Sequence, residues 1–415
     1  MKTYRPGALA PILALALSTA GAVSAPLTAQ ARTFTVLYSF TGSPDGGNPA
    51  GLTLGMAGTV YGATIAGGAP GCYIGAGYGT VFDLTLTPGS WSESVLYTFT
   101  GGADGDSPSS SVLLDAGGNL YGTAEGGGSE VCSLGCGVAF ELSPGSGGWT
   151  QTVLYSFQGG TGGSHPSAAL VFDKHGHLYS TLANGGTYGS GSVYELTNGA
   201  GGWKEKILHS FNGGEPAGAV ILDAAGNLYG TTTSSDSGGG TVFELLHGSW
   251  KARILHKFTG LDGSTPEAGL VFDKAGNLYG TTEGGGKYSK GVVFKLAPGA
   301  KGKWKETVLH TFKGGSDGNN PLTTPVLDKA GNLYGTAPYG GSACNCGTVF
   351  KLTPGKGGRW KETVLHRFTG GSDGSVPDTG LIIDAAGNLY GTTFFGGNTG
   401  CYNNGGCGVV FEITP

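Results

Sequence analysis

A unit of about 55 residues recurs seven times along the 415-residue chain, and this repetition constrains the fold more than any other feature. Each unit is marked by a tyrosine, at Tyr61, Tyr121, Tyr179, Tyr229, Tyr279, Tyr334 and Tyr390. Two further aromatic positions keep the same count, one at Phe82, Phe140, Tyr194, Phe243, Phe294, Phe350 and Phe411, the other at Phe40, Phe99, Phe157, Phe211, Phe258, Phe312 and Phe368. A repeat of this length usually forms one supersecondary unit that packs against its neighbours.

Four short strands are predicted in each unit. In the unit around Tyr279 they span residues 268–273, 277–282, 291–296 and 304–312, which are rich in Val, Leu, Thr, Tyr and Phe and bounded by Gly, Pro or Asp. Asp273 and Gly276 predict a tight hairpin between the first two strands, because Asp accepts backbone N–H bonds and Gly adopts positive φ. Gly and Pro are spaced too closely for ordinary helices.

Seven consecutive units of four antiparallel strands indicate an all-β fold, a seven-bladed β-propeller. The chain after residue 31 begins with a fourth-type strand at 33–40 and stops after a third-type strand at 409–413. The N-terminal strand is therefore expected to complete the last blade, which closes the ring and leaves no open sheet edge. Residues 32–415 are predicted to form this single domain.

Composition agrees with a packed protein although 85 Gly and 19 Pro make up about a quarter of the chain. Hydrophobic residues are 38% and charged residues 12%, which is unlike a disordered segment. A net charge of −5 offers no basic surface for nucleic acid.

The first 31 residues are predicted to be a signal peptide. Lys2 and Arg5 precede an apolar stretch at 8–17, and Ala29-Gln30-Ala31 fits a small-x-small cleavage site. No later stretch is long and apolar enough for a transmembrane helix. We therefore expect a secreted or periplasmic monomer, in a compartment that permits disulfides.

The repeat resembles that of a known family. The pattern D-x-x-G-N-L-Y-G-T, then G-T-V-F-K-L-T-P, then W-K-E-T-V-L-H-x-F, as at 328–336 and 347–368, is similar to the GloVer-type tandem repeat of exported bacterial proteins, whose members carry varied C-terminal anchors (choice-of-anchor). The likeness covers about residues 33–415. It implies the fold and an exported location, and it implies no catalytic residues. Because the chain ends at its last repeat, no anchoring domain is expected.

Two sets of loops should emerge on one face of the propeller: those between the second and third strands (the 2–3 loops) and those from the fourth strand of one blade to the first of the next (the 4–1 loops). Five 4–1 loops keep an Asp-Gly pair, at Asp45, Asp104, Asp262, Asp317 and Asp373. We interpret these mainly as turn residues. A ring of carboxylates that binds Ca²⁺ is the alternative, because hard cations prefer oxygen ligands; no other cofactor is expected.

The histidines and tryptophans of the fourth strands are assigned to packing. His209, His256, His310 and His366 occupy the position that Tyr38, Tyr97 and Tyr155 fill in other units, so they lie in different blades and cannot form one zinc site. His165, His175 and His177 break the repeat, but the last two lie on the face opposite His165.

The variable 2–3 loops are better suited to recognition than to scaffolding. Glu125 and Glu283 stand four residues after the marker tyrosine and could act as an acid/base pair in a glycosidase or lyase, if a substrate spans the channel. Nearby aromatics could stack on sugar rings, although loop packing is the simpler interpretation: Tyr73, Tyr78, Tyr188, Tyr288, Tyr339, Phe395 and Tyr402.

All seven cysteines fall in these loops. Cys132–Cys136 and Cys401–Cys407 are each close in sequence and are predicted to form local disulfides. Cys344–Cys346 is a third such pair, although a Cys-x-Cys bridge would be strained. Zinc binding by these cysteines is the alternative. Cys72 is left over and could pair across the ring closure.

Taken together, the sequence favours an exported module that binds a glycan or a protein through the loop face. A glycoside-active hydrolase or lyase comes second, and a structural extracellular protein third.

Overall fold

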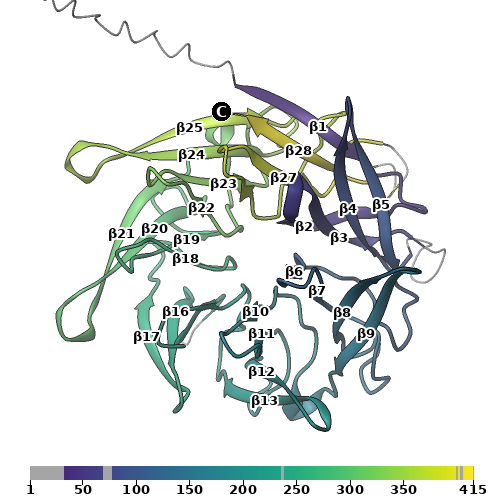
Figure 1. Cartoon of the computed structure of the whole chain (residues 1–415). Coiled ribbons are helices and arrows are strands. Elements are labelled where there is room, and N and C mark those ends of the chain that lie inside the picture. Colours follow the sequence, from purple (N-terminus) through teal and green to yellow (C-terminus); the bar gives the residue numbers. More distant parts are fainter. Residues whose placement is uncertain (1–31, 69–76, 235–237, 399–400, 402–404, 415) are drawn as a thin grey trace, which may run out of the picture. The chain divides into compact units, whose positions relative to one another are not determined.

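The computed structural model describes residues 32–68, 77–234, 238–398, 401 and 405–414. Seven four-stranded antiparallel sheets form the blades of a ring, as the repeat predicts (Figure 1). Among these residues, helical structure is limited to five 3-10 turns: η1 Met56–Gly58, η2 Gly160–Gly162, η3 Ala300–Gly302, η4 Gly315–Asp317 and η5 Lys356–Gly358.

Blades 1 to 6 are each built from four consecutive strands. Their innermost strands are β2 Gly47–Leu54, β6 Leu113–Leu114, β10 Val171–Phe172, β14 Ile221–Leu222, β18 Val271–Phe272 and β22 Val326–Leu327. The second strands are β3 Val60–Ala66, β7 Leu120–Ala124, β11 Leu178–Leu182, β15 Leu228–Thr232, β19 Leu278–Thr282 and β23 Leu333–Ala337. The third strands are β4 Thr80–Thr87, β8 Val138–Gly145, β12 Ser192–Gly199, β16 Thr241–Leu246, β20 Val292–Pro298 and β24 Thr348–Pro354. The outermost strands are β5 Ser90–Thr98, β9 Gly148–Ser156, β13 Gly202–Ser210, β17 Lys251–Lys257, β21 Trp304–Thr311 and β25 Trp360–Arg367.

Blade 7 joins the two ends of the chain. Its sheet has the order β26 (Ile382–Ile383), β27 (Leu389–Thr393), β28 (Val409–Thr414) and β1 (Thr33–Ser39), with Thr33 opposite Thr414 and Ser39 opposite Val409. This confirms the predicted ring closure, in which β1 covers the edge that β28 would otherwise expose.

The innermost strands are mostly shorter than the sequence predicts. Residues 268–273 were expected as one strand, yet only Val271–Phe272 pair with β19. The backbone before Val271 instead forms a hydrogen bond with the neighbouring blade, in which the hydroxyl of Thr231 donates to the carbonyl oxygen of Ala268 at 2.8 Å. The same hydroxyl-to-carbonyl bond links five other pairs of adjacent blades, from Thr123, Thr181, Thr281, Thr336 and Thr392.

The hydrophobic core lies between the blades. At all seven interfaces an aromatic ring that follows the outermost strand of one blade meets the ring of the third strand of the next, with centroids 5.0–5.3 Å apart: Phe40–Phe82, Phe99–Phe140, Phe157–Tyr194, Phe211–Phe243, Phe258–Phe294, Phe312–Phe350 and Phe368–Phe411. Five tryptophans lie against the marker tyrosine of the preceding blade, at Trp91, Trp149, Trp250, Trp304 and Trp360. The assignment of these residues to packing agrees with these contacts.

A glycine and a proline form a second contact at every interface. The glycine before each third strand lies against a proline of the next blade, as in Gly408 and Pro49 of β2, where a Cβ on the glycine would lie 2.6 Å from the proline Cδ. The other pairs are Gly79–Pro108, Gly137–Pro166, Gly191–Pro216, Gly240–Pro266, Gly291–Pro321 and Gly347–Pro377. The blades can approach this closely only because the glycine has no side chain.

We expect Gly408→Ala to weaken the closure of the ring. Gly408 has a φ of +85°, so alanine there suffers backbone strain and collides with the carbonyl oxygen of Thr393 in its own blade as well as with Pro49 of the next blade. Together these should lower the free energy of unfolding by about 3 kcal/mol. Gly276→Ala is the matched control, because its φ of +79° is similar and no atom lies within 4 Å of the added Cβ.

Urea unfolding of both variants measures this difference. Gly276→Ala should cost about 1 kcal/mol, from backbone strain alone. Equal destabilisation by the two substitutions would contradict the role given to the contact. Removal of residues 32–39 should destabilise the protein further, because it exposes the edge of β28.

Candidate functional site

The 2–3 and 4–1 loops lie on one face of the ring, called the loop face below. In blade 2, Gly126 of the 2–3 loop exchanges backbone hydrogen bonds with Asp106 of the 4–1 loop, and the N–H of Gly128 donates to Gly102. Equivalent bonds recur, for example between Ser375 and Phe395. The loop pairs are therefore fixed by backbone bonds, while their side chains differ from blade to blade.

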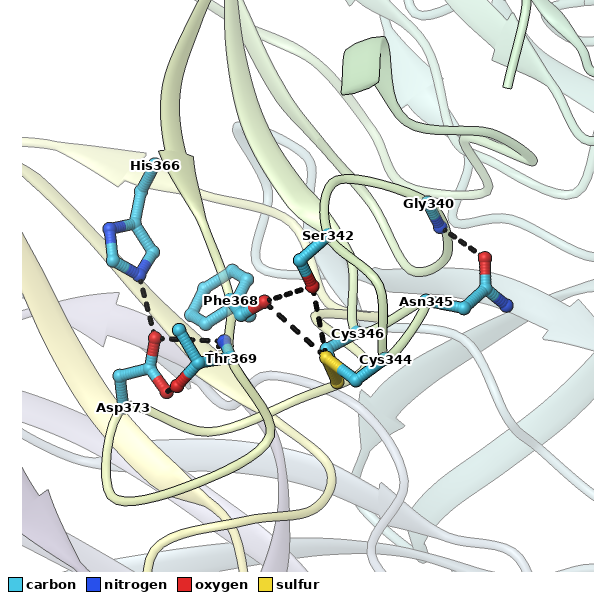
Figure 2. The surroundings of a disulfide bond; sticks show 9 residues. All are labelled: Gly340, Ser342, Cys344, Asn345, Cys346, His366, Phe368, Thr369 and Asp373. Carbon is cyan, nitrogen blue, oxygen red and sulfur yellow. Dashed lines mark hydrogen bonds and ion pairs between the residues drawn. A yellow bond between two sulfur atoms is a disulfide. The ribbon is translucent and has the colours of Figure 1, made fainter. Parts of the chain in front are cut away.

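The five aspartates of the 4–1 loops each bond to their own turn. Asp262 accepts hydrogen bonds from the backbone N–H and the hydroxyl of Thr259, and it contacts Nε2 of His256 at 3.0 Å. Asp373 is bonded in the same way by Thr369 and His366 (Figure 2). These bonds agree with turn residues in five separate blades.

Asp45 and Asp104 are held by a tyrosine in place of the histidine, through the hydroxyls of Tyr38 and Tyr97. Asp317 accepts from the N–H of Lys313 and lies 3.8 Å from Nε2 of His310. Within the described part of the chain, no three His, Cys, Asp or Glu side chains come together as a metal-binding group. Calcium binding at these aspartates stays a prediction.

A row of glutamates on the outermost strands lies beside these turns, and the sequence reasoning missed it. Glu93, Glu306 and Glu362 each stand two residues after a tryptophan, and each has one carboxylate oxygen that is buried without a hydrogen-bond partner in the described structure. Burial, and to a smaller extent the charge of Asp262, raises the pKa of Glu306 to about 7. Blade 2 has a neutral side chain at this position, Gln151, which donates to the carbonyl oxygen of Asp104.

The two glutamates predicted as an acid/base pair lie on 2–3 loops of blades 2 and 5. Glu125 accepts a hydrogen bond of 2.8 Å from the hydroxyl of Ser109. At the equivalent place in blade 5, Glu283 has a second carboxylate beside it, Glu267. Burial and the charge of Glu283 raise the pKa of Glu267.

Both Glu267 and Asp378 directly follow the proline that leads into an innermost strand, so they stand at the loop-face end of the central strands. Burial raises the pKa of Asp378 to about 7, and its Oδ1 has no hydrogen-bond partner among the described residues. Sequence reasoning missed both residues, although their position one residue after the repeated proline was a signal that could have found them.

Of the predicted aromatic ligands, three are strongly exposed. Tyr188, Tyr288 and Tyr339 are 60%, 42% and 40% exposed. Phe395 is half-buried, with its ring 4.7 Å from that of Phe394. Tyr78 packs into the core between blades 1 and 2, where a Cβ on Gly101 would collide with its ring. Tyr73 and Tyr402 lie outside the described residues, as does Cys72.

The structure has disulfides between Cys132 and Cys136, Cys344 and Cys346, and Cys401 and Cys407. Each lies against a glycine of the 4–1 loop that leads to the next blade, namely Gly159, Gly370 and Gly42. Figure 2 shows the second of these disulfides, where the hydroxyl of Ser342 donates to the carbonyl oxygen of Phe368 beside Cys344. Each disulfide thus closes a 2–3 loop on itself and packs it against the neighbouring 4–1 loop.

The fold and the repeat define a seven-bladed β-propeller built of tandem repeats. The chain belongs to the Gloeobacter/Verrucomicrobia repeat family, whose model matches residues 17–235 and 216–415. No curated protein matches the chain. None of the described helices is long and apolar enough to cross a membrane.

Several solved structures share the fold at low sequence identity. A catalytically inactive virginiamycin B lyase from Staphylococcus aureus, solved with quinupristin, is 12% identical with a TM-score of 0.57, over 92% of this chain and 99% of that one. The extracellular domain of a B. thetaiotaomicron protein described as a hybrid two-component system is 12% identical with a TM-score of 0.58, over 93% of this chain and 42% of that one. At these identities the likeness shows the fold alone.

The row of buried glutamates predicts a specific pH dependence of stability. The raised pKa of Glu306 means that the folded protein favours the protonated carboxyl. The free energy of unfolding therefore falls as pH rises from the pKa of an unfolded glutamate through about 7, where the carboxyl ionises in the folded protein. Glu306→Gln should therefore stabilise the protein at pH 8 and change little at pH 4, as measured by Tm across this range.

The exposed Glu130 supplies the control for net charge. Glu130→Gln removes the same charge from the surface and should not produce the rise at pH 8. A Glu306→Gln variant that is less stable than the parent at pH 8 would show that the ionised carboxylate has a favourable partner there.

Proposed function

We propose that this protein is an exported binding module whose ligand lies on the loop face. The distribution of exposed hydrophobic side chains supports this location. Ten large hydrophobic side chains of the described residues are exposed, and six of them lie on the loop face: Val131, Leu134, Tyr188, Leu261, Tyr288 and Tyr339. Exposed apolar groups gathered on one face, rimmed by polar groups, are typical of interaction sites.

Rigid loops strengthen the case for binding. Backbone bonds between the 2–3 and 4–1 loops, together with the three disulfides, fix the loops before a ligand arrives, which reduces the entropy lost on binding. The phenol rings of Tyr188, Tyr288 and Tyr339 offer flat apolar faces with a polar edge, which suits the face of a sugar ring. An extracellular glycan is therefore the first ligand class to test, and a protein is the alternative.

A glycan array with the protein lacking residues 1–31 tests the proposal. Replacing Tyr188, Tyr288 and Tyr339 together by Ala should weaken binding by about tenfold or more, because stacking side chains in an interface contribute much of the affinity. Met56→Ala and Leu86→Ala are controls, since these exposed hydrophobic residues lie away from the loop face. Addition of Ca²⁺ to parallel arrays tests the aspartates of the 4–1 loops.

The outcomes separate the alternatives. If the parent protein binds a protein ligand but no glycan, and the tyrosine variant loses that binding, the face is assigned to protein recognition. A face that retains neither, or a tyrosine variant that binds like the parent, would contradict the binding role and leave a structural protein.

One observation favours a second candidate function, a glycoside-active hydrolase or lyase. Such enzymes need a carboxylic acid that is protonated near neutral pH beside a second, ionised carboxylate. Glu267 and Glu283 are two neighbouring carboxylates in blade 5, and burial and the charge of Glu283 raise the pKa of Glu267.

Incubation with acidic and neutral polysaccharides, followed by assays for reducing ends and for unsaturated products, tests this candidate. Glu267→Gln and Glu283→Gln should each reduce turnover by about a hundredfold or more. Glu125→Gln should leave it unchanged, because in blade 2 Ser109 occupies the position of Glu267 and donates to Glu125. Absence of turnover by the parent protein would exclude the enzyme.

A further inference from the structure

A cavity of about 380 Å³ opens between blades 3 and 4 on the face opposite the loop face. Its walls are the turn after β10, the turn after β14 and the turn between β16 and β17. The volume falls in the range of about 300–1,000 Å³ that is typical of small-ligand pockets. Neither the repeat nor the loop face accounts for it.

A shortened hairpin explains why the cavity lies at this interface. The hairpin between the third and outermost strands is shorter in blade 4 than in blade 6. Trp250 follows Phe243 by seven residues, whereas Trp360 follows Phe350 by ten. In the short turn Trp250 has a φ of +50°. Its contact with Tyr179 is also changed, because the planes of the two rings are inclined at 48°. In blades 5 and 6 the corresponding rings meet at 62° and 63°.

Two substitutions coincide with this shortened hairpin. The turn after β10 carries His175 where blades 4 and 5 have Ala225 and Ala275, and His177 where the other blades with this turn have Asn. Three of the eight histidines of the chain, at positions 175, 177 and 247, therefore gather in and beside the cavity. Such departures at one interface of an otherwise repeating structure point to a local role.

The acceptor groups of the cavity are already used by the protein. Oδ1 of Asp223 accepts hydrogen bonds from the backbone N–H groups of Ala225 and Asn227. Oδ2 of Asp223 accepts from the side-chain amide of Asn227 and the hydroxyl of Tyr229. Asp173 receives two backbone N–H bonds on Oδ1, and it contacts Nδ1 of His177 at 3.2 Å on Oδ2. These bonds saturate both carboxylates, so they offer few acceptors to a ligand.

The donor groups, in contrast, are not used. Lys174, His175 and His247 line the cavity and are exposed, and their side-chain nitrogens have no hydrogen-bond partner among the described residues. Phe172 and Leu222 supply apolar wall between them. A ligand that satisfies this cavity must therefore present hydrogen-bond acceptors on a body with an apolar face. A negative charge on that ligand is favoured next to Lys174, because the carboxylates of Asp173 and Asp223 also line the cavity.

We propose that this cavity binds a six-membered ring that bears a carboxylate, specifically the uronic acid unit of an acidic glycan. The carboxylate would accept from Lys174, His175 and His247, and one face of the ring would lie on Phe172 and Leu222. The site is independent of the proposed loop-face function, because it lies on the other face of the ring and shares no residue with it.

Isothermal titration calorimetry with sodium glucuronate, glucose and benzoate tests the assignment on the protein lacking residues 1–31. Glucuronate should bind saturably and about tenfold or more tighter than glucose, which lacks the carboxylate. The double variant Lys174→Gln, His175→Ala should lose about tenfold or more in affinity for glucuronate. Lys274→Gln is the matched control, since it changes the equivalent turn of blade 5, which already has Ala275.

A second pair of variants tests the cavity itself. Ala225→Trp should fill it and abolish binding, whereas Ala275→Trp in the equivalent turn of blade 5 should not, with Tm confirming that both fold. Equal affinity for glucose and glucuronate, or unchanged affinity in the lysine–histidine variant, would overturn the proposal. Binding of benzoate without glucuronate would overturn the sugar assignment. Loss of binding at the loop face would not affect any of these results.

Discussion

The contact on which the rest of the structure depends is the one between adjacent blades, repeated at seven interfaces. Each interface combines a pair of aromatic rings, such as Phe40 and Phe82, with a proline packed on a glycine, such as Pro49 on Gly408. A four-stranded sheet cannot bury both of its faces alone, so the blades are stable only as a ring. The glycine is required because any side chain there would separate the blades.

This division of roles explains where the sequence is free to vary. The backbone of the 2–3 and 4–1 loops is bonded in the same way around the ring, so loop side chains can change without loss of the scaffold. The residue before the glycine of the interface illustrates this freedom. It is Tyr78 in blade 1, Lys290 in blade 5 and a disulfide-bonded cysteine in blades 2, 6 and 7, and in each case it covers a glycine of the neighbouring 4–1 loop.

The sequence predicted those features that depend on residues repeated at fixed intervals. The blade number, the pairing of β1 with β28 and the family follow from such intervals. It predicted less well the features that depend on contacts between segments. Glu267 was missed because its neighbour Glu283 is brought close only by the pairing of Ser264 with Gly284. The innermost strands are shorter than predicted because part of their backbone forms hydrogen bonds with the neighbouring blade. The carbonyl oxygen of Ala268, for example, accepts from the hydroxyl of Thr231.

The cavity between blades 3 and 4 shows what exceptions to a repeat can signify. A single change, such as Tyr194 in place of Phe, leaves the ring fully buried and in the same contact with the neighbouring blade. The shortened hairpin of blade 4 and the substitutions at His175 and His177 in blade 3 come from two different segments, and they meet at one interface on one face. Independent drift would scatter such changes around the ring. A selected binding site requires such convergence, together with side-chain donors that have no partner among the described residues. Packing alone requires neither.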